Sequence, residues 1–296
     1  MCQLHNNSRR NDPTQTSRIR AQAIKELKRR RNGAGAELIK FVRSLERYAK
    51  RQVVEDGQVV NRVVYRYELD PSVNPDATIK AIIAKWFAPG ERKPDRYFFD
   101  QYIAAAYNQG NAIETARLGM LAGNIEGMTQ SQVEMMLQSP AYQNRLNILA
   151  QRAFEDMADF AGDAAGPLRY ALARGMAEGK GIRSLVADMR KEWPKQADYR
   201  LERIARTEIA QAHRSARKDA DTDARDRLGL TIKMQWISQL SPTTREDHAA
   251  QHLKIFEIEE VDEVYAGLSG NSINCLCVQQ SVVISEDGEV LGERKQ

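Results

Sequence analysis

The side chains best suited to chemistry are two histidines and two cysteines in the C-terminal part of the chain. His248 and His252 are four residues apart, and a single leucine separates Cys275 from Cys277. Histidines at this spacing share one face of a helix, and cysteines at alternate positions of an extended segment point to the same side. Two imidazoles and two thiolates form a ligand set for tetrahedral zinc. The four residues are therefore a candidate metal site.

The same side chains allow two other interpretations. A cysteine beside a histidine can act as a nucleophile, with Glu208 as the acid that orients the ring, so the alternative function is a metal-dependent or thiol enzyme centred on His248, Cys275 and Cys277. In the third interpretation the thiols pack beside His248 as a small structural cluster. The sequence contains no Gly-rich phosphate loop and no acidic cluster of the nuclease kind. We therefore expect no enzymatic activity and no cofactor.

Glu208 belongs to a long helix expected between Pro194 and Gly229. At about 100° per residue, Leu201, Ala205 and Ile209 fall in one apolar arc, and the Glu208 carboxylate lies inside that arc. Burying a carboxylate without a partner costs several kcal/mol. We therefore expect a core ion pair between Glu208 and Arg245, with His248 as the alternative partner.

The segment after this helix is expected to be a small mixed α and β unit. Residues 231–237 alternate as in a strand, and residues 241–244 form a turn before a short helix that carries both histidines. The cysteine segment is expected to continue into a strand that includes residues 282–284. A hairpin turn is predicted at residues 286–289.

The N-terminal part of the chain is basic. Residues 1–66 contain 16 Lys and Arg against 6 Asp and Glu, whereas the remaining residues contain 28 against 34. Such a split predicts a basic arm that contacts phosphate or an acidic protein surface, and the alternative is a solvated helix face. The candidate contact residues are Arg29, Arg30, Arg31, Arg43, Arg47 and Arg51.

The pattern of apolar residues and breakers divides the chain into five segments. We expect a disordered tail at 1–16, a basic helical arm with a β-hairpin at 17–76, a helical domain at 77–196, a mixed domain at 197–285 and a charged tail at 286–296. Gly33 and Gly35 are expected to interrupt the arm helix, which then resumes as far as Ala49, and Asp56-Gly57 predicts the hairpin turn. The helices expected in the helical domain are about 77–87, 96–122, 130–137, 141–161, 166–178 and 182–192.

Composition sets the broad class. The 296 residues include three cysteines, one of them at position 2, which is too few for a disulfide framework and favours synthesis in a reducing cytoplasm. No apolar run approaches the roughly 20 residues of a membrane span, and the first residues lack the apolar core of a signal peptide. The predicted fold class is α+β and predominantly α-helical, with a helical scaffold and a small C-terminal α+β domain.

Four short motifs, taken in order, give the chain a family resemblance. They are Ala205-Arg-Thr-Glu208, Trp236, Thr244-Arg-x-x-His248 and Asn274-Cys-x-Cys277. This order resembles the phage Mu F-like minor head proteins, also called head morphogenesis proteins.

The resemblance implies a minor structural protein of a tailed phage, made in the host cytoplasm and located in the virion, inside the head near the portal vertex. The implied partners are the portal protein and capsid or scaffold proteins, with packaged double-stranded DNA as a further contact. No membrane partner is implied.

Overall fold

The structure is a computed structural model that describes residues 13–50, 53–55, 58–60, 63–68, 74–94, 96–121, 135 and 138–294. The chain forms two compact units. Unit 1 contains Met1–Ala23, Pro94–Arg152 and Arg203–Gln296, and unit 2 contains Ile24–Lys93 and Ala153–Glu202. The predicted fold class is confirmed, because the described residues are mainly helical and include a small antiparallel sheet near the C-terminal end.

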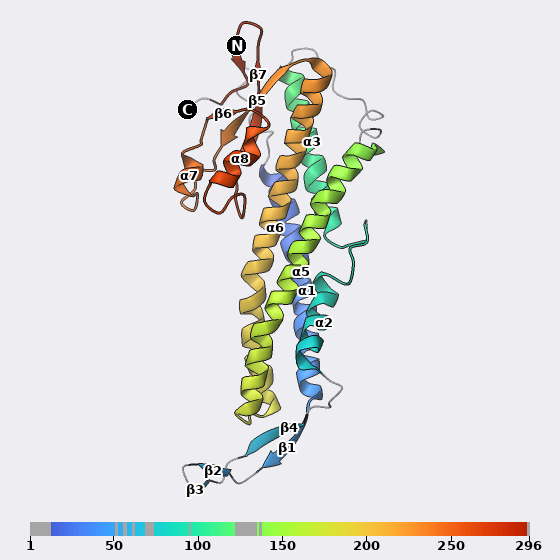
Figure 1. Cartoon of the computed structure of the whole chain (residues 1–296), viewed down its shortest axis with the longest axis vertical. Coiled ribbons are helices and arrows are strands. Elements are labelled where there is room, and N and C mark those ends of the chain that lie inside the picture. Colours follow the sequence, from blue (N-terminus) through green and yellow to red (C-terminus); the bar gives the residue numbers. More distant parts are fainter. Residues whose placement is uncertain are drawn as a thin grey trace. The chain divides into compact units, whose positions relative to one another are not determined.

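Figure 1 labels all of the following elements except β8. The helices are α1 (Pro13–Ser44), α2 (Pro75–Phe87), α3 (Asp100–Leu121), α5 (Pro140–Ala177), α6 (Ile182–Leu228), α7 (Glu246–Ala249) and α8 (Glu260–Gly267). The strands are β1 (Glu46–Lys50), β2 (Val53–Glu55), β3 (Gln58–Val60), β4 (Val64–Glu68), β5 (Thr231–Ile237), β6 (Ile255–Phe256), β7 (Val278–Ile284) and β8 (Val290–Leu291). Among the described residues, no helix combines the length and the apolar character that a membrane crossing requires. The helix expected at 130–137 lies largely outside the described residues.

The interruption expected in α1 is absent, because its glycines admit tryptophan rings. The ring of Trp86 lies where a Cβ atom on Gly33 would be, and Trp193 lies in the same way against Gly35. The indole Nε1 of Trp193 also donates a hydrogen bond to the Arg31 carbonyl at 2.9 Å. Within unit 2, the close packing therefore outweighs the low helix propensity of glycine.

Two other predicted breaks lie inside continuous helices. The break expected near residues 162–166 falls within α5, which contains Pro167, and the break expected at Pro194 falls within α6. A proline inside a helix removes one backbone hydrogen bond. The turns around these prolines carry buried side chains, including Leu168 and Trp193, so packing holds the helix across the missing bond.

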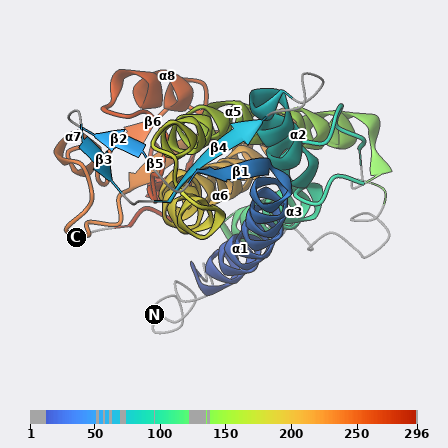
Figure 2. The same cartoon turned by 90° about the horizontal axis from the view of Figure 1, so that it is seen from below.

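The β part of unit 2 contains more strand than predicted. The predicted hairpin strands are confirmed as β2 and β3, which pair antiparallel, while the Asp56-Gly57 turn lies outside the described residues. The arm helix ends at Ser44 and not at Ala49, and Glu46–Lys50 instead forms β1, which pairs with β4 (Figure 2). This strand pair contacts the turn between α5 and α6, since the Tyr67 hydroxyl donates to the Lys180 carbonyl at 2.6 Å.

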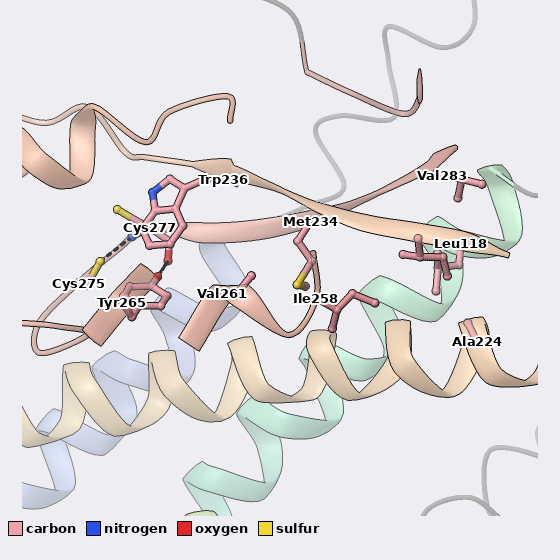
Figure 3. Close-up of a cluster of buried hydrophobic side chains, with 11 residues drawn as sticks. Leu118, Ala224, Met234, Trp236, Ile258, Val261, Tyr265, Cys275, Cys277 and Val283 are labelled. Atoms are coloured by element: carbon pink, nitrogen blue, oxygen red, sulfur yellow. Dashed lines mark hydrogen bonds between the residues drawn. The ribbon is translucent and has the colours of Figure 1, made fainter. Parts of the chain in front are cut away.

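Unit 1 contains the four-stranded antiparallel sheet, in the order β6-β5-β7-β8. The predicted strand at 231–237 is confirmed as β5, and the three residues expected on one face, Ile232, Met234 and Trp236, are all buried in one apolar cluster. Val261 and Tyr265 of α8 pack into this cluster together with residues of α3 and α6 (Figure 3). As predicted, Gly229 follows the end of α6, and its positive φ of 66° allows the chain to turn toward β5.

Candidate functional site

Three of the four predicted metal ligands meet in the interior of unit 1. His248 lies on α7, and Cys275 and Cys277 lie in the extended segment that leads into β7. The His248 Nδ1 atom is 3.4 Å from the Cys275 sulfur and 3.8 Å from the Cys277 sulfur. These residues retain only 1%, 5% and 3% of their exposure, respectively. We call these three residues the thiol–imidazole cluster.

Local backbone geometry turns both sulfurs inward. Asn274 has a φ of 52°, a left-handed conformation that asparagine tolerates better than most residues. Its amide donates to the Thr207 hydroxyl of α6 at 2.9 Å, which fixes the start of the cysteine segment. Leu276 between the cysteines is exposed while Cys275 and Cys277 are buried. The prediction that both thiols lie on one side of an extended segment is therefore confirmed.

The second nitrogen of His248 has partners of its own. Nε2 lies 3.1 Å from the Ser269 carbonyl oxygen and 3.2 Å from Nη1 of Arg245. When Nε2 carries the proton and donates to Ser269, the lone pair of Nδ1 faces the sulfurs. The Arg245 guanidinium also donates to the Ile273 carbonyl at 2.7 Å, and Gly270 leaves room for its close approach.

A set of buried hydrogen bonds surrounds the cluster. The Trp236 indole donates to Ser238 Oγ at 3.1 Å, and this hydroxyl donates to the His248 carbonyl at 2.5 Å. The Tyr265 hydroxyl donates to the Cys277 carbonyl at 3.3 Å, a bond drawn in Figure 3. The strand, the α7 turn and α8 therefore all hold the cluster.

The two thiols differ in acidity. A hydrogen bond from the Cys277 thiol lowers the pKa of Cys275 to about 5, with further contributions from the Cys277 amide, Arg214 and His248. The pKa of Cys277 is raised, first by that same hydrogen bond and then by burial. The two sulfurs therefore differ in acidity, with Cys275 the more acidic of the two.

His252 does not join the cluster. The prediction assumed that one helix carries both histidines, but α7 ends at Ala249 and the chain then continues as a turn. The His252 Nδ1 atom instead accepts the Ser238 amide at 3.1 Å. The structure thus brings together three of the four proposed ligands.

Glu208 is buried as expected, with 2% of its residue surface exposed, but its partner differs from the prediction. Its carboxylate accepts a hydrogen bond from Arg152 of α5 at 3.2 Å, whereas Arg245 lies beside His248 Nε2 and donates to carbonyls of the 271–273 turn. The expected Glu208–Arg245 pair is therefore replaced by Glu208–Arg152. Glu208 consequently does not orient the His248 ring.

The candidate arginines of the arm differ in their surroundings. Arg29 and Arg30 both pair with Glu26, and Arg31 pairs with Asp198 of α6 within unit 2. The three others lie further along: Arg43 is exposed, Arg47 is exposed with its guanidinium 5.9 Å from the Tyr65 ring centroid, and Arg51 lies outside the described residues. The run Arg29–Arg31 therefore partly serves the packing of unit 2.

Several residues that hold the cluster were not identified from the sequence. Thr207 lies within the Ala-Arg-Thr-Glu motif, so the motif could have identified it. Ser238 directly follows a strand, and its role depends on a chain turn that no periodicity reveals. Ser269 acts through its backbone carbonyl, which any residue supplies, so no sequence pattern could have found it.

A second set of polar side chains meets at Ser281 of β7, on the face of the chain that also carries Cys277. The Arg217 guanidinium donates to Glu114 of α3, and the Ser281 hydroxyl contacts both Glu114 and, at 2.6 Å, Asp221. Arg117 donates to the Ser281 carbonyl at 3.0 Å. Burial and the neighbouring Glu114 raise the pKa of Asp221 well above its ordinary value. We call these five residues the charged cluster.

Comparison with known proteins connects the thiol–imidazole cluster to one family. Residues 167–280 match the family model described as Phage Mu protein F like protein. No curated protein and no solved structure matches the chain. The matched region includes Thr207, His248 and both cysteines, so the whole cluster lies within it.

Proposed function

We propose, from the match of residues 167–280 to the Phage Mu protein F like family, that the chain is a minor structural protein of a tailed-phage head. The family resemblance drawn from the sequence is confirmed over this region, and it implies a minor head or head morphogenesis protein. The finer proposal is that the protein docks at the portal vertex inside the head and takes part in assembly. The family match is the observation that carries this proposal.

The organisation of the cluster supports a positioning role over a catalytic one. Both sulfurs are buried, and the His248 ring is held by the Ser269 carbonyl rather than by a carboxylate. A cysteine nucleophile needs access to its substrate and a base in a defined orientation. The cluster instead joins two chain segments within unit 1, the α7 turn and the segment that enters β7. The alternative thiol enzyme is therefore the less supported function.

The arm is proposed to contact packaged DNA or an acidic surface of the portal protein. Within the described residues, Arg29, Arg43 and Arg47 present exposed guanidinium groups. The excess of basic residues in 1–66 supports an electrostatic contact of this kind. Such contacts neutralise phosphates without reading bases, so the proposed DNA binding has no sequence preference.

Location in the head tests the central proposal. In heads purified from the phage that encodes this chain, an epitope tag on the chain should label one vertex per particle in electron micrographs. Quantitative mass spectrometry should give a low copy number relative to the major capsid protein. Absence from purified heads, or label spread over all vertices, would contradict the proposal.

DNA binding by the arm is tested separately. A variant with Arg29, Arg43 and Arg47 changed to Ala should bind a duplex more weakly in fluorescence anisotropy at low salt. Its dependence of log K on log salt should fall by about 0.9 for each phosphate that the arm no longer neutralises. A matched control changes the exposed Arg183, Arg190 and Lys191 of α6 to Ala. Equal weakening in both variants would contradict a specific role for the arm, and no binding by the wild type would leave protein docking as its role.

A further inference from the structure

We propose that His248, Cys275 and Cys277 bind one zinc ion, which joins the α7 turn to the segment that enters β7. This inference goes beyond the proposed function, because it concerns how the domain is held together and not where the protein is located. It also replaces the four-residue ligand set predicted from the sequence by three residues. Three features of the cluster support it: the distances between the side chains, the neighbours of the ligands and the charge.

The distances between the three side chains suit a tetrahedral ion. With zinc bonds of about 2.3 Å to sulfur and about 2.0 Å to nitrogen, neighbouring ligand atoms of a tetrahedron are about 3.5 Å apart for N and S and about 3.8 Å for two sulfurs. The His248 Nδ1 atom is 3.4 and 3.8 Å from the two sulfurs, and all three atoms lie within 4.8 Å of one another. Only small side-chain shifts are therefore needed for all three to reach one ion.

The neighbours of the ligands are those that a metal site needs. A histidine ligand usually donates its other N–H to a carbonyl or carboxylate, which fixes the ring orientation. Here the Ser269 carbonyl lies 3.1 Å from His248 Nε2, so the Nδ1 lone pair is directed at the sulfurs. The Cys277 amide donates to the Cys275 sulfur at 3.3 Å, a bond that stabilises a thiolate.

The charge of the ligands also favours a bound cation. Binding through both sulfurs as thiolates places two negative charges in the interior, and zinc balances both charges in one buried site. The three protein ligands leave a fourth position, which falls to a water molecule or to the Ser238 hydroxyl, whose oxygen is 3.7 Å from the Cys277 sulfur. Borderline-soft zinc suits a set of two sulfurs and one nitrogen better than magnesium or calcium does.

Metal content of the full-length protein, purified without a histidine tag or chelators, is the first test. Mass spectrometry for metals should find about one zinc per chain, as expected for one tetrahedral site. The variants Cys275→Ser, Cys277→Ser and His248→Gln should each lose it. The matched controls are His252→Gln, four residues from His248 but outside the cluster, and Cys2→Ser, which removes the third cysteine. Both controls should keep the zinc.

A second measurement applies if a ligand variant fails to fold. Wild-type protein stripped with a chelator should take up Co²⁺ and show thiolate-to-cobalt charge transfer in the near ultraviolet, and added zinc should abolish this absorption and raise the melting temperature. A folded wild-type protein that contains no zinc and takes up no Co²⁺ would overturn the proposal. Loss of zinc in His252→Gln as complete as in His248→Gln would overturn the three-residue ligand set.

Discussion

The thiol–imidazole cluster and the charged cluster lie on one face of the same extended segment. They differ in how their buried polar side chains are paired. Cys277 and Ser281 are four residues apart, so both side chains point toward the helices of unit 1. Around Ser281 the carboxylates of Glu114 and Asp221 meet the guanidinium groups of Arg117 and Arg217. Around Cys277, two sulfurs and one nitrogen converge on each other. The charged cluster pairs carboxylates with guanidinium groups, whereas the other cluster brings together two thiols and one imidazole, with Arg214 and Arg245 beside it.

The largest expected effect comes from breaking the charged cluster. Arg217→Ala removes the guanidinium that contacts the fully buried Glu114 carboxylate. Removing one partner of a buried ion pair typically costs about 3–5 kcal/mol, because the other charge stays buried. We expect a loss of this size in the free energy of unfolding measured by urea denaturation.

An exposed ion pair provides the control for this variant. Arg225 lies on the same helix and pairs with Glu259 at 2.6 Å in a solvent-exposed position. Solvent screens such pairs, so Arg225→Ala should leave the urea midpoint nearly unchanged. Similar losses in the two variants would show that the charged cluster contributes no more than surface pairs do.

The buried histidines His248 and His213 differ in their hydrogen-bond partners, and this difference predicts how stability changes as pH falls. His248 has partners on both nitrogens, whereas the His213 Nε2 atom is buried and has no hydrogen-bond partner among the described residues. Burial, with the nearby Arg217, Arg214 and Arg20, lowers the pKa of His213 to about 3. The stabilisation from its neutral form is complete above pH 6.5, its ordinary pKa, and is lost progressively as pH falls toward 3.

The variant His213→Gln isolates this effect. The wild type should lose up to about 1.4 kcal/mol for each pH unit below 6.5 through this residue, while the glutamine variant lacks that contribution. Urea midpoints measured between pH 7 and about pH 4 should therefore fall less steeply in the variant. Parallel curves for the two proteins would show that His213 takes up no proton on unfolding in this range.

The sequence predicted the two clusters unequally, and the reason is physical. Strict alternation in an extended segment predicted that Cys275 and Cys277 share a side, and helical periodicity predicted a buried Glu208. Both are local geometry and both are confirmed. The partner of Glu208 depends on which helix packs against α6, and several arginines could have reached it. Periodicity cannot choose among them, so Arg245 was predicted where Arg152 lies.

The same limit explains the helices. Gly33, Gly35 and Pro194 are helix breakers by propensity, yet the helices continue through them because the tryptophan rings of Trp86 and Trp193 pack at these turns. Conversely, His252 was placed beside His248 on the assumption of a longer helix, and α7 ends after Ala249. The charged cluster was not predicted at all, since its members come from α3, α6 and β7 and share no spacing along the chain.

A smaller effect is expected from removing the Ser238 hydrogen bonds that surround the thiol–imidazole cluster. Ser238→Ala removes the acceptor of the Trp236 indole and the donor to the His248 carbonyl. Leaving a buried indole N–H unsatisfied costs about 1–3 kcal/mol. Ser269→Ala is the control, because it retains the backbone carbonyl that contacts His248 and removes only a solvent-exposed hydrogen bond from the Ser269 hydroxyl to Asp247. Thermal unfolding should show a clear loss for the first variant only, and equal losses would contradict the role of the Ser238 hydroxyl.

The smallest expected effect has the opposite sign and tests whether the charge of Asp221 stabilises or destabilises the charged cluster. Burial and Glu114 raise the pKa of Asp221, against the opposing effects of Ser281, Arg217 and Arg117. A raised pKa in the folded state means that its contribution to stability is complete below the ordinary pKa of 3.8 and is lost as pH rises through the folded pKa. Asp221→Asn keeps an acceptor for the Ser281 hydroxyl without the charge. We therefore expect it to gain on the order of 1 kcal/mol at alkaline pH and little at acid pH. A variant less stable than the wild type in alkaline urea denaturation would show that the Asp221 charge is needed, and that the arginines of this cluster outweigh its desolvation.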